Sequence, residues 1–372
     1  MTHIFKNLSL VMPAVMGMAL TGMAQVKKIN VTTTAVPFLR ISSDARAGAM
    51  GETGVATSAD VNSQFYNVAK YAFATNKTGV GMTYTPWLRK LGLNDVYLAS
   101  LAGYYKVDDN QAISVSIKYF SLGNLQMTDN SGNDLYVQHP REMSIDAGYS
   151  KKLSDHLSLG IALRYINSDI AGTGSSNGTT YKTGKAVAGD LGLYYTTVKE
   201  GKNGWSAGAA FSNLGSKVSY SSDANNQNFL PANLGLGAGH TWFTNEVHKI
   251  SVTGEVNKLL VPAAPSGGSE EDMKTYNKTG VVSSWGKSFS NNAMAYSAGA
   301  EYVYDGQFSV RAGYYTDSRN MGKRNYFTTG VGVKYTAFDF NFSYLVPSGS
   351  GANTNPLSNT IRFSLLITPG AK

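Results

Sequence analysis

Residues 157–165 read LSLGIALRY, with an apolar side chain at every second position and Ser, Gly, Ala and Arg between them. Alternation with a period of two is typical of a β-strand that has one apolar and one polar face. The same pattern recurs at 113–119 (ISVSIKY), 338–344 (FDFNFSY) and 361–367 (IRFSLLI). Its polar positions carry small or charged residues, which suit a watery or plugged lumen better than a dry sandwich core. The pattern therefore predicts an all-β, transmembrane antiparallel barrel.

Composition agrees with a barrel. Only 15% of the 372 residues are charged, against roughly 25% in average globular proteins, while Gly numbers 40 and Tyr 23. The mean hydropathy is −0.19, as expected when each strand shows only one face to lipid. The chain has no Cys, so it has no disulfides and no thiol metal site.

Fourteen strands can be counted in residues 77–368. Their connections alternate between short and long, as in outer-membrane barrels with short periplasmic turns and longer extracellular loops. An even count returns both chain ends to the periplasm. The expected strands are 77–86, 93–107, 109–122, 142–153, 156–170, 186–198, 203–213, 231–244, 247–260, 292–305, 306–318, 324–336, 337–347 and 358–368. The longer loops are expected at about 122–141, 170–185, 214–230, 261–290 and 348–357.

The N-terminus reads as a cleaved signal peptide. Lys6 precedes an apolar stretch, 8–20, and Gly22 and Ala24 form a small-residue cleavage site before Gln25. A membrane anchor is the alternative reading, but the stretch is shorter than the roughly 20 residues that span a bilayer. We therefore expect an exported protein of the outer membrane of a Gram-negative bacterium.

Residues 25–76 do not alternate and are rich in Ala, Ser and Gly. Asp44 is placed to cap a helical turn through 45–50. We expect this segment to plug the lumen as a hatch, with Asp44 and Arg46 hydrogen-bonded to lumen groups. The expected division is a signal peptide at 1–24, a hatch at 25–76 and a barrel at 77–372.

Aromatic residues gather near the expected strand ends, where girdles of amphipathic rings mark the lipid–water boundaries. A core role in a soluble β-protein is the less favoured reading, because the polar alternate positions leave no dry second face. The girdle candidates are Tyr84, Trp87, Tyr104, Tyr105, Tyr194, Tyr195, Trp242, Phe243, Tyr302, Tyr304, Tyr314 and Tyr315.

Several chemistries find no support in the sequence. The formal charge of +8 comes from scattered residues rather than a basic–aromatic patch, which disfavours nucleic acid and favours a surface excess of Lys or attraction to anionic lipopolysaccharide. The five His show no metal spacing. Strand carboxylates such as Asp146, Asp190 and Asp339 are expected to pair with lumen cations such as Lys118, Arg164, Arg311 and Lys334. No catalytic constellation can be assembled, and we expect no enzyme and no cofactor.

One segment carries a family resemblance. Residues 38–51, FLRISSDARAGAMG, with 54–56 and Asn67-Val68-Ala69, resemble the opening of long-chain fatty-acid transporter-type barrels, in which a hatch precedes 14 strands. Those barrels often have Asn-Pro-Ala where this chain has Asn67-Val68-Ala69. The pattern Ile-x-x-Asp-Ala-Arg-Ala-x-x-Met-Gly from Ile41 to Gly51 is similar to the PorV branch of that superfamily. Its motif residues here are Asp44, Ala45, Arg46, Met50 and Gly51.

The resemblance implies a non-enzymatic component of the type IX protein secretion system. Such a barrel would dock at a giant translocon barrel (SprA/Sov-like). It would receive secreted proteins by their C-terminal signal domain and shuttle them to an attachment complex with a PorU-like sortase. Outer-membrane lipid would surround it. A transporter for hydrophobic compounds is the alternative, and a general porin is disfavoured because a hatch of about 50 residues would fill the lumen.

Loops would then carry recognition, because loops on rigid scaffolds carry function. Residues 261–290 show no strand pattern, and a structureless loop of that length is usually functional or disordered. We expect a partner-binding loop here, with a solvated decoration as the alternative. Its candidate residues are Pro262, Pro265, Glu270, Glu271 and Asp272.

Overall fold

The fold is taken from a computed structural model, which describes residues 31–129, 131–170, 172, 174–176, 179–223, 226–265, 269–346, 357 and 359–370. The expected signal peptide, and most of the expected loop at 348–357, lie outside the described residues. None of the described helices is long and apolar enough to cross a membrane.

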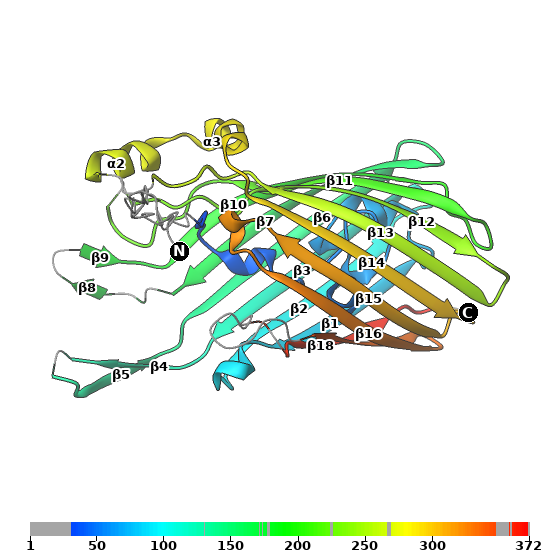
Figure 1. Cartoon of the computed structure of the whole chain (residues 1–372), viewed down its shortest axis with the longest axis horizontal. Coiled ribbons are helices and arrows are strands. Elements are labelled where there is room, and N and C mark those ends of the chain that lie inside the picture. Colours follow the sequence, from blue (N-terminus) through cyan, green and yellow to red (C-terminus); the bar gives the residue numbers. More distant parts are fainter. Residues whose placement is uncertain are drawn as a thin grey trace, which may run out of the picture.

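In the described part of the chain, fourteen antiparallel strands close into a barrel (Figure 1). Each strand pairs with the next barrel strand along the chain, and β18 pairs with β1 over five residue pairs to close the ring. The predicted barrel is confirmed, and no strand boundary moves by more than three residues. The barrel strands are β1 (Thr78–Pro86), β2 (Val96–Lys106), β3 (Gln111–Leu122), β6 (Arg141–Lys152), β7 (Leu157–Asp169), β10 (Gly184–Thr196), β11 (Gly204–Gly215), β12 (Asn233–Phe243), β13 (His248–Leu259), β14 (Met294–Tyr304), β15 (Phe308–Asp317), β16 (Asn325–Tyr335), β17 (Phe338–Leu345) and β18 (Ile361–Ile367).

The strand faces follow the alternation. On β7, Leu163 is 70% exposed on the outer wall, whereas Ala162 and Arg164 are buried in the lumen. On β3, Val115 faces outward and Ser116 inward. Lipid therefore covers the apolar face, and the polar face meets the contents of the lumen.

The expected aromatic girdle is only partly correct. Tyr84, Trp242 and Tyr304 face outward, but Trp87 and several others are buried inside the barrel. Neighbouring positions on a strand point to opposite faces, so only one ring of each adjacent pair can reach lipid. The candidates that face inward are Trp87, Tyr104, Tyr194 and Tyr315.

The N-terminal segment lies inside the barrel (Figure 1). It forms η1 (Pro37–Arg40), α1 (Ala45–Ala49), η2 (Val61–Phe65) and η3 (Val68–Phe73). Near its start, the Thr32 and Ala35 amides donate to the carbonyls of Asn320 (2.8 Å) and Phe229 (2.9 Å) at the long-loop end. The segment then reaches β1 at the short-turn end, where β18 also finishes. The even number of strands does place the start of β1 and the end of β18 at the same end of the barrel. The first described residues of the N-terminal segment lie at the opposite end.

The long loops contain regular structure. Two hairpins, β4 (Leu125–Thr128) with β5 (Asp134–Gln138) and β8 (Gly174–Ser176) with β9 (Thr179–Tyr181), extend beyond the barrel. The expectation of a structureless region at 261–290 is wrong, because α2 (Glu270–Lys278), α3 (Val281–Lys287) and η5 (Ser288–Ser290) lie there. Two further short turns are η4 (Arg89–Leu91) and η6 (Arg319–Met321).

Candidate functional site

The hatch motif builds the contact between hatch and barrel. The Asp44 side chain accepts a hydrogen bond from the Ala47 amide (2.8 Å) and so caps α1, as the sequence predicts. This bond lies within the hatch itself, not on the lumen wall as expected. The contact with the barrel wall at this turn is made by Ala45, whose amide donates to Ser364 Oγ on β18 (2.9 Å).

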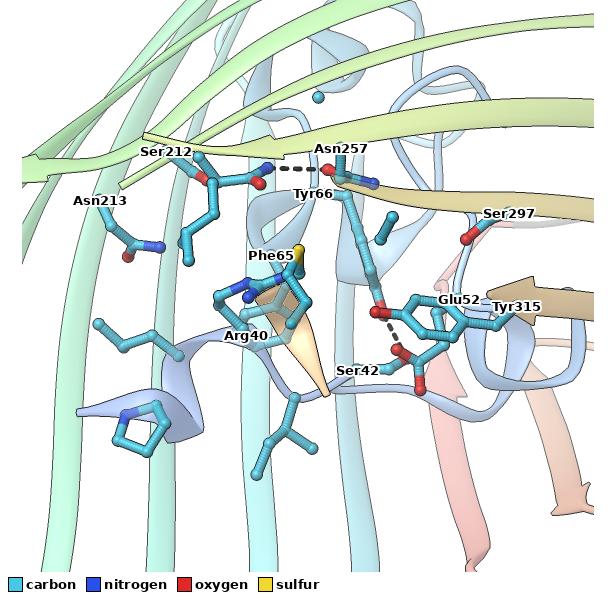
Figure 2. A pocket seen from close by; sticks show the side chains of 18 of the residues that line it. Arg40, Ser42, Glu52, Phe65, Tyr66, Ser212, Asn213, Asn257, Ser297 and Tyr315 are labelled. Atoms are coloured by element: carbon cyan, nitrogen blue, oxygen red, sulfur yellow. Dashed lines mark hydrogen bonds between the residues drawn. The ribbon is translucent and has the colours of Figure 1, made fainter. Parts of the chain in front are cut away.

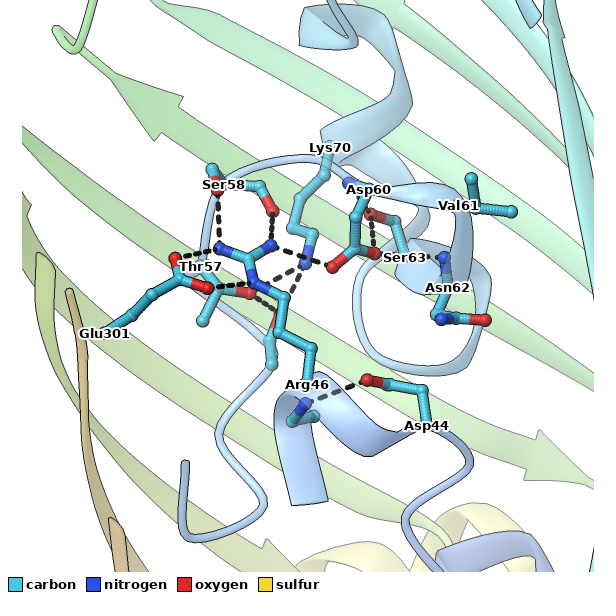
Figure 3. A network of polar contacts seen from close by, with 12 residues as sticks. Asp44, Arg46, Thr57, Ser58, Asp60, Val61, Asn62, Ser63, Lys70 and Glu301 are labelled. Carbon is cyan, nitrogen blue, oxygen red and sulfur yellow. Dashed lines mark hydrogen bonds and ion pairs between the residues drawn. The ribbon is translucent and has the colours of Figure 1, made fainter. Parts of the chain in front are cut away.

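Arg46 makes the central ion pairs of the hatch (Figure 3). Its guanidinium donates from Nε and Nη2 to both carboxylate oxygens of Glu301 on β14, at 2.9 and 2.8 Å. It also donates to Asp60 Oδ2 (2.9 Å) within the hatch. Glu301 accepts a further bond from Arg311 Nε (2.7 Å) and is 3% exposed. The predicted lumen partner of Arg46 is therefore confirmed as a buried carboxylate held between two arginines.

A second wall carboxylate holds the hatch backbone. Glu255 Oε2 on β13 accepts hydrogen bonds from the amides of Gly54 (2.8 Å) and Val55 (2.9 Å). Ser158 of β7 and Ser206 of β11 donate to the hatch carbonyls of Ala69 and Ala56, each at 2.7 Å. Many strands therefore fix the hatch, and each contact joins residues distant in sequence.

Glycine allows the close approach of hatch and wall. Gly51 has φ +67°, and a Cβ there would lie 2.5 Å from the carbonyl oxygen of Tyr314. On the facing strand, a Cβ at Gly313 would overlap the backbone of Met50 and Gly51. The strand glycines thus fit the expectation that they let a plug pack closely.

The remaining lumen charges are paired only in part as expected. Arg164 pairs with Asp146 and with Asp190 (2.9 Å). Asp339 accepts instead from Asn341 Nδ2 (2.8 Å), and Lys118 donates to the hatch carbonyl of Leu39 (3.2 Å). No cluster of three or more potential metal ligands occurs among the described residues.

A cavity of about 510 Å³ remains between the hatch and the long-loop end of the wall (Figure 2). Its lining includes the apolar side chains of Phe65, Trp87 and Met321, but also Arg40 and Glu52. Tyr66 and Ser42 share a hydrogen bond of 2.9 Å across it. The cavity is therefore mixed in polarity rather than a continuous apolar pocket.

Outside the lumen, α2, α3 and η5 form a folded unit, here termed the outer cap, which contains the three acidic residues predicted from the sequence, whereas the two prolines precede it. Pro262 is buried, and its carbonyl accepts from Tyr276 Oη (3.1 Å). Asp272 accepts from the Ser269 amide (2.9 Å) in a capping box. Glu271 is exposed, Pro265 is half-buried, and Glu270 is described only by its place at the start of α2. The acidic run therefore forms the first turn of a helix, where negative charge is favourable.

Several contacts fasten the outer cap to the loop after β11 and to β13, where Lys258 Nζ lies 5.9 Å from the centroid of the Phe289 ring. The ring of Tyr276 packs edge-on against Phe229, with centroids 5.5 Å apart, and burial raises the pKa of Tyr276 to about 12. Lys217 Nζ donates to the carbonyl of Asn277 (2.6 Å), and burial lowers the pKa of Lys217.

Sequence reasoning missed the exposed apolar residues at this end. Val282 on α3 is 73% exposed and Phe289 on η5 is 66% exposed. The β4–β5 hairpin exposes Leu135 and Tyr136. The sequence did contain short signals for these elements. The capping pattern Ser269-x-x-Asp272 marks the start of α2, and the turn at 129–133 joins β4 to β5. Single exposed apolar residues are ordinary, so these side chains are candidate contacts that need a direct binding test.

The geometry defines a class: a fourteen-stranded antiparallel outer-membrane barrel whose lumen is occupied by an N-terminal hatch. A family model described as type IX secretion system protein PorV matches residues 24–266, more than half of the chain. The chain therefore belongs to the PorV family. None of the curated proteins compared with the chain matches it.

Solved structures support the same fold. The monoaromatic hydrocarbon channel CymD aligns with a TM-score of 0.54 and 11% identity, over 88% of this chain and 98% of that one. The Ralstonia pickettii toluene transporter TbuX gives 0.52 and 13%, over 88% and 98%. The P. putida toluene transporter TodX gives 0.51 and 13%, over 87% and 96%. At these identities the likeness concerns the fold alone.

Proposed function

We propose that this barrel is a non-enzymatic carrier of the type IX secretion system. It docks beside a giant translocon barrel (SprA/Sov-like), receives secreted proteins by their C-terminal signal domain, and delivers them to an attachment complex with a PorU-like sortase. Membership of the PorV family supports a role in this system. The shuttle step, and each named partner, are the proposal.

One observation carries the proposal: the lumen is occupied and the outer cap is exposed. Buried ion pairs such as Arg46–Glu301 (2.8 Å) hold the hatch across the lumen, so a folded domain cannot pass through. Contact with cargo must then be made above the membrane or sideways. Val282 and Phe289 offer apolar anchors there, and the acidic turn at 270–272 with Pro262 and Pro265 completes the proposed partner-binding loop.

The test is a pull-down from detergent-solubilised outer membrane. Val282→Ser with Phe289→Ser should reduce recovery of the giant barrel and of cargo, because two exposed anchors are lost. The control is Val107→Ser with Leu153→Ser, an apolar pair in the short turns that is also exposed, at 53% and 55%. If the Val282→Ser, Phe289→Ser variant recovered both partners as well as the unmodified protein does, the outer cap would not be the partner-binding surface.

A second double substitution tests whether the charge of the acidic turn contributes to partner binding. Glu270→Gln with Glu271→Gln keeps the Ser269–Asp272 capping box and neutralises the rest of the acidic turn. Lower recovery would assign the acidic side chains a direct contact. Unchanged recovery would leave them a role in starting α2 only.

A second candidate is a transporter for hydrophobic compounds, favoured by the apolar part of the cavity at Phe65, Trp87 and Met321. Arg40 and Glu52 in the same lining disfavour it, because an apolar ligand would take water away from these charged groups without replacing its hydrogen bonds. Uptake of a radiolabelled aromatic hydrocarbon into proteoliposomes decides between the two. Uptake that depends on the protein, without recovery of secretion partners, would favour transport.

We also propose export by cleavage of residues 1–24, which leaves a hatch at 25–76 and a barrel at 77–372. Intact-mass measurement of the purified protein tests the cleavage, and a mature chain that does not begin at Gln25 would correct it.

A further inference from the structure

A second hollow lies on the outer wall of the barrel, and no described hatch residue lines it. Its volume is about 730 Å³. It opens at the long-loop ends of β6, β7 and β10 and at the loop that follows β11. Its lining is Arg141, Asn167, Asp169, Lys182, Thr183, Lys185, Lys217 and Ser219.

The strand residues of this hollow face lipid rather than the lumen. Arg141 is exposed, whereas its neighbour Glu142 is buried in the barrel. Lys185 is exposed between Gly184 and Ala186, which are buried. Register places Lys185 opposite Asn167, and Arg141 opposite Asp169, so the residues are neighbours on one surface.

The hollow lies at the edge of the apolar band. Two positions further along β10 from Lys185, Val187 is 58% exposed to lipid, and on β7 Tyr165 and Leu163 are exposed below Asn167. Two residues of a strand span about 7 Å. The cations therefore lie just beyond the hydrocarbon region, at the level of the outer-leaflet headgroups.

Charge in the hollow is one-sided. Four cationic side chains face one carboxylate, Asp169. In the described part of the chain, the head groups of Arg141, Lys182 and Lys185 have no hydrogen-bond or ion-pair partner, and Lys217 uses one donor on the Asn277 carbonyl. Unpaired cations at a lipid boundary attract anionic headgroups.

We propose that this hollow binds a phosphate group of an outer-leaflet glycolipid. Arg141, Lys182 and Lys185 supply charge-assisted donors for the phosphate oxygens. Asn167, Thr183 and Ser219 supply neutral polar groups suited to a sugar. The acyl chains would then lie along Leu163 and Val187. This inference is independent of the proposed carrier function.

The test uses the whole protein in detergent and native mass spectrometry. The probes are bisphosphorylated lipid A, the same lipid without phosphates, and inorganic phosphate as competitor. The variant is Arg141→Gln with Lys182→Gln and Lys185→Gln. The control, Lys278→Gln with Lys287→Gln and Arg319→Gln, removes the same charge from exposed residues at the same end.

The triple variant should bind bisphosphorylated lipid A roughly a hundredfold more weakly, as expected for loss of three cations beside an anionic headgroup. The control should bind as the unmodified protein does, and inorganic phosphate should not displace the lipid. The comparison of phosphorylated and dephosphorylated lipid uses the unmodified protein, so it does not depend on the folding of any variant.

Three results would overturn the proposal. Equal binding of phosphorylated and dephosphorylated lipid would exclude phosphate recognition. Equal loss in the triple variant and the control would indicate general charge attraction. Displacement by inorganic phosphate would assign the hollow to a free anion.

Discussion

The hatch and the outer cap are both short helical segments attached to the same barrel, and they are held in opposite ways. The hatch is buried and is held by apolar packing together with polar contacts, in which Arg46 pairs with Glu301 and Glu255 accepts from backbone amides. The outer cap is fastened at few points, such as Tyr276, and exposes Val282 and Phe289. One segment is built to stay in place, and the other leaves apolar surface available to a partner.

The largest expected effect is on permeability. Deleting residues 30–70 should convert a closed barrel into a conducting pore, because the hatch occupies the lumen. The measurement is single-channel recording in planar bilayers. Deletion of 270–278 from the outer cap is the control and should leave the barrel closed. If the hatch deletion gave no conductance, the lumen would be closed by other residues and the comparison would fail.

The next effect tests the buried ion pair. Glu301→Ala leaves Arg46 and Arg311 without their shared carboxylate and should lower the free energy of unfolding by about 3–5 kcal/mol. Urea unfolding in lipid vesicles measures it. Glu271→Ala, an exposed carboxylate of the outer cap, should change stability by less than about 0.5 kcal/mol. Similar values for the two variants would contradict the contrast between the regions.

Close packing of hatch and wall has a smaller effect. Gly313→Ala places a methyl group against the backbone of Met50 and Gly51, which should cost about 1–3 kcal/mol as overpacking. Gly254→Ala is the matched control, because a Cβ there lies 3.9 Å from its nearest neighbour, the Ser297 carbonyl. A tolerated Gly313→Ala would mean that the hatch can move away from the wall.

The smallest effect is local. Tyr276→Phe removes the hydrogen bond to the Pro262 carbonyl and should weaken the seating of the outer cap by about 1 kcal/mol. Hydrogen exchange of residues 269–290 should become faster, while the urea midpoint of the barrel stays unchanged. A shift of the whole unfolding curve would show that the outer cap is part of the barrel's cooperative unit.

Much of the fold can be predicted from the sequence because lipid imposes the pattern directly. Residues such as Leu163 and Val115 meet hydrocarbon whatever their neighbours are, so alternation alone locates the strands. The β4–β5 hairpin and the outer cap lie beyond the bilayer, where no such pattern is enforced. They follow turn and capping signals that extend over only a few residues.

The site was less predictable. Alternation indicates that Glu301 and Glu255 face the lumen, but not which hatch atoms they meet. Arg46 and Glu301 are separated by 255 residues, and a single sequence carries no record of that pairing. The facing of the aromatic residues was also hard to predict, because a ring near a strand end can lie on either face. Tyr104, for example, was expected in the girdle but faces the lumen.

The bond between the first and last parts of the chain sets an order of assembly. The Ala45 amide meets Ser364 across 319 positions, and Arg362 pairs with Glu52 (3.2 Å) beside it. The strand that closes the ring is thus held by the segment synthesised near the beginning. Contacts so distant in sequence form slowly, and these two can form only after the last strand has been synthesised. The chain must therefore be delivered whole, and kept from aggregating, before its final strand can dock.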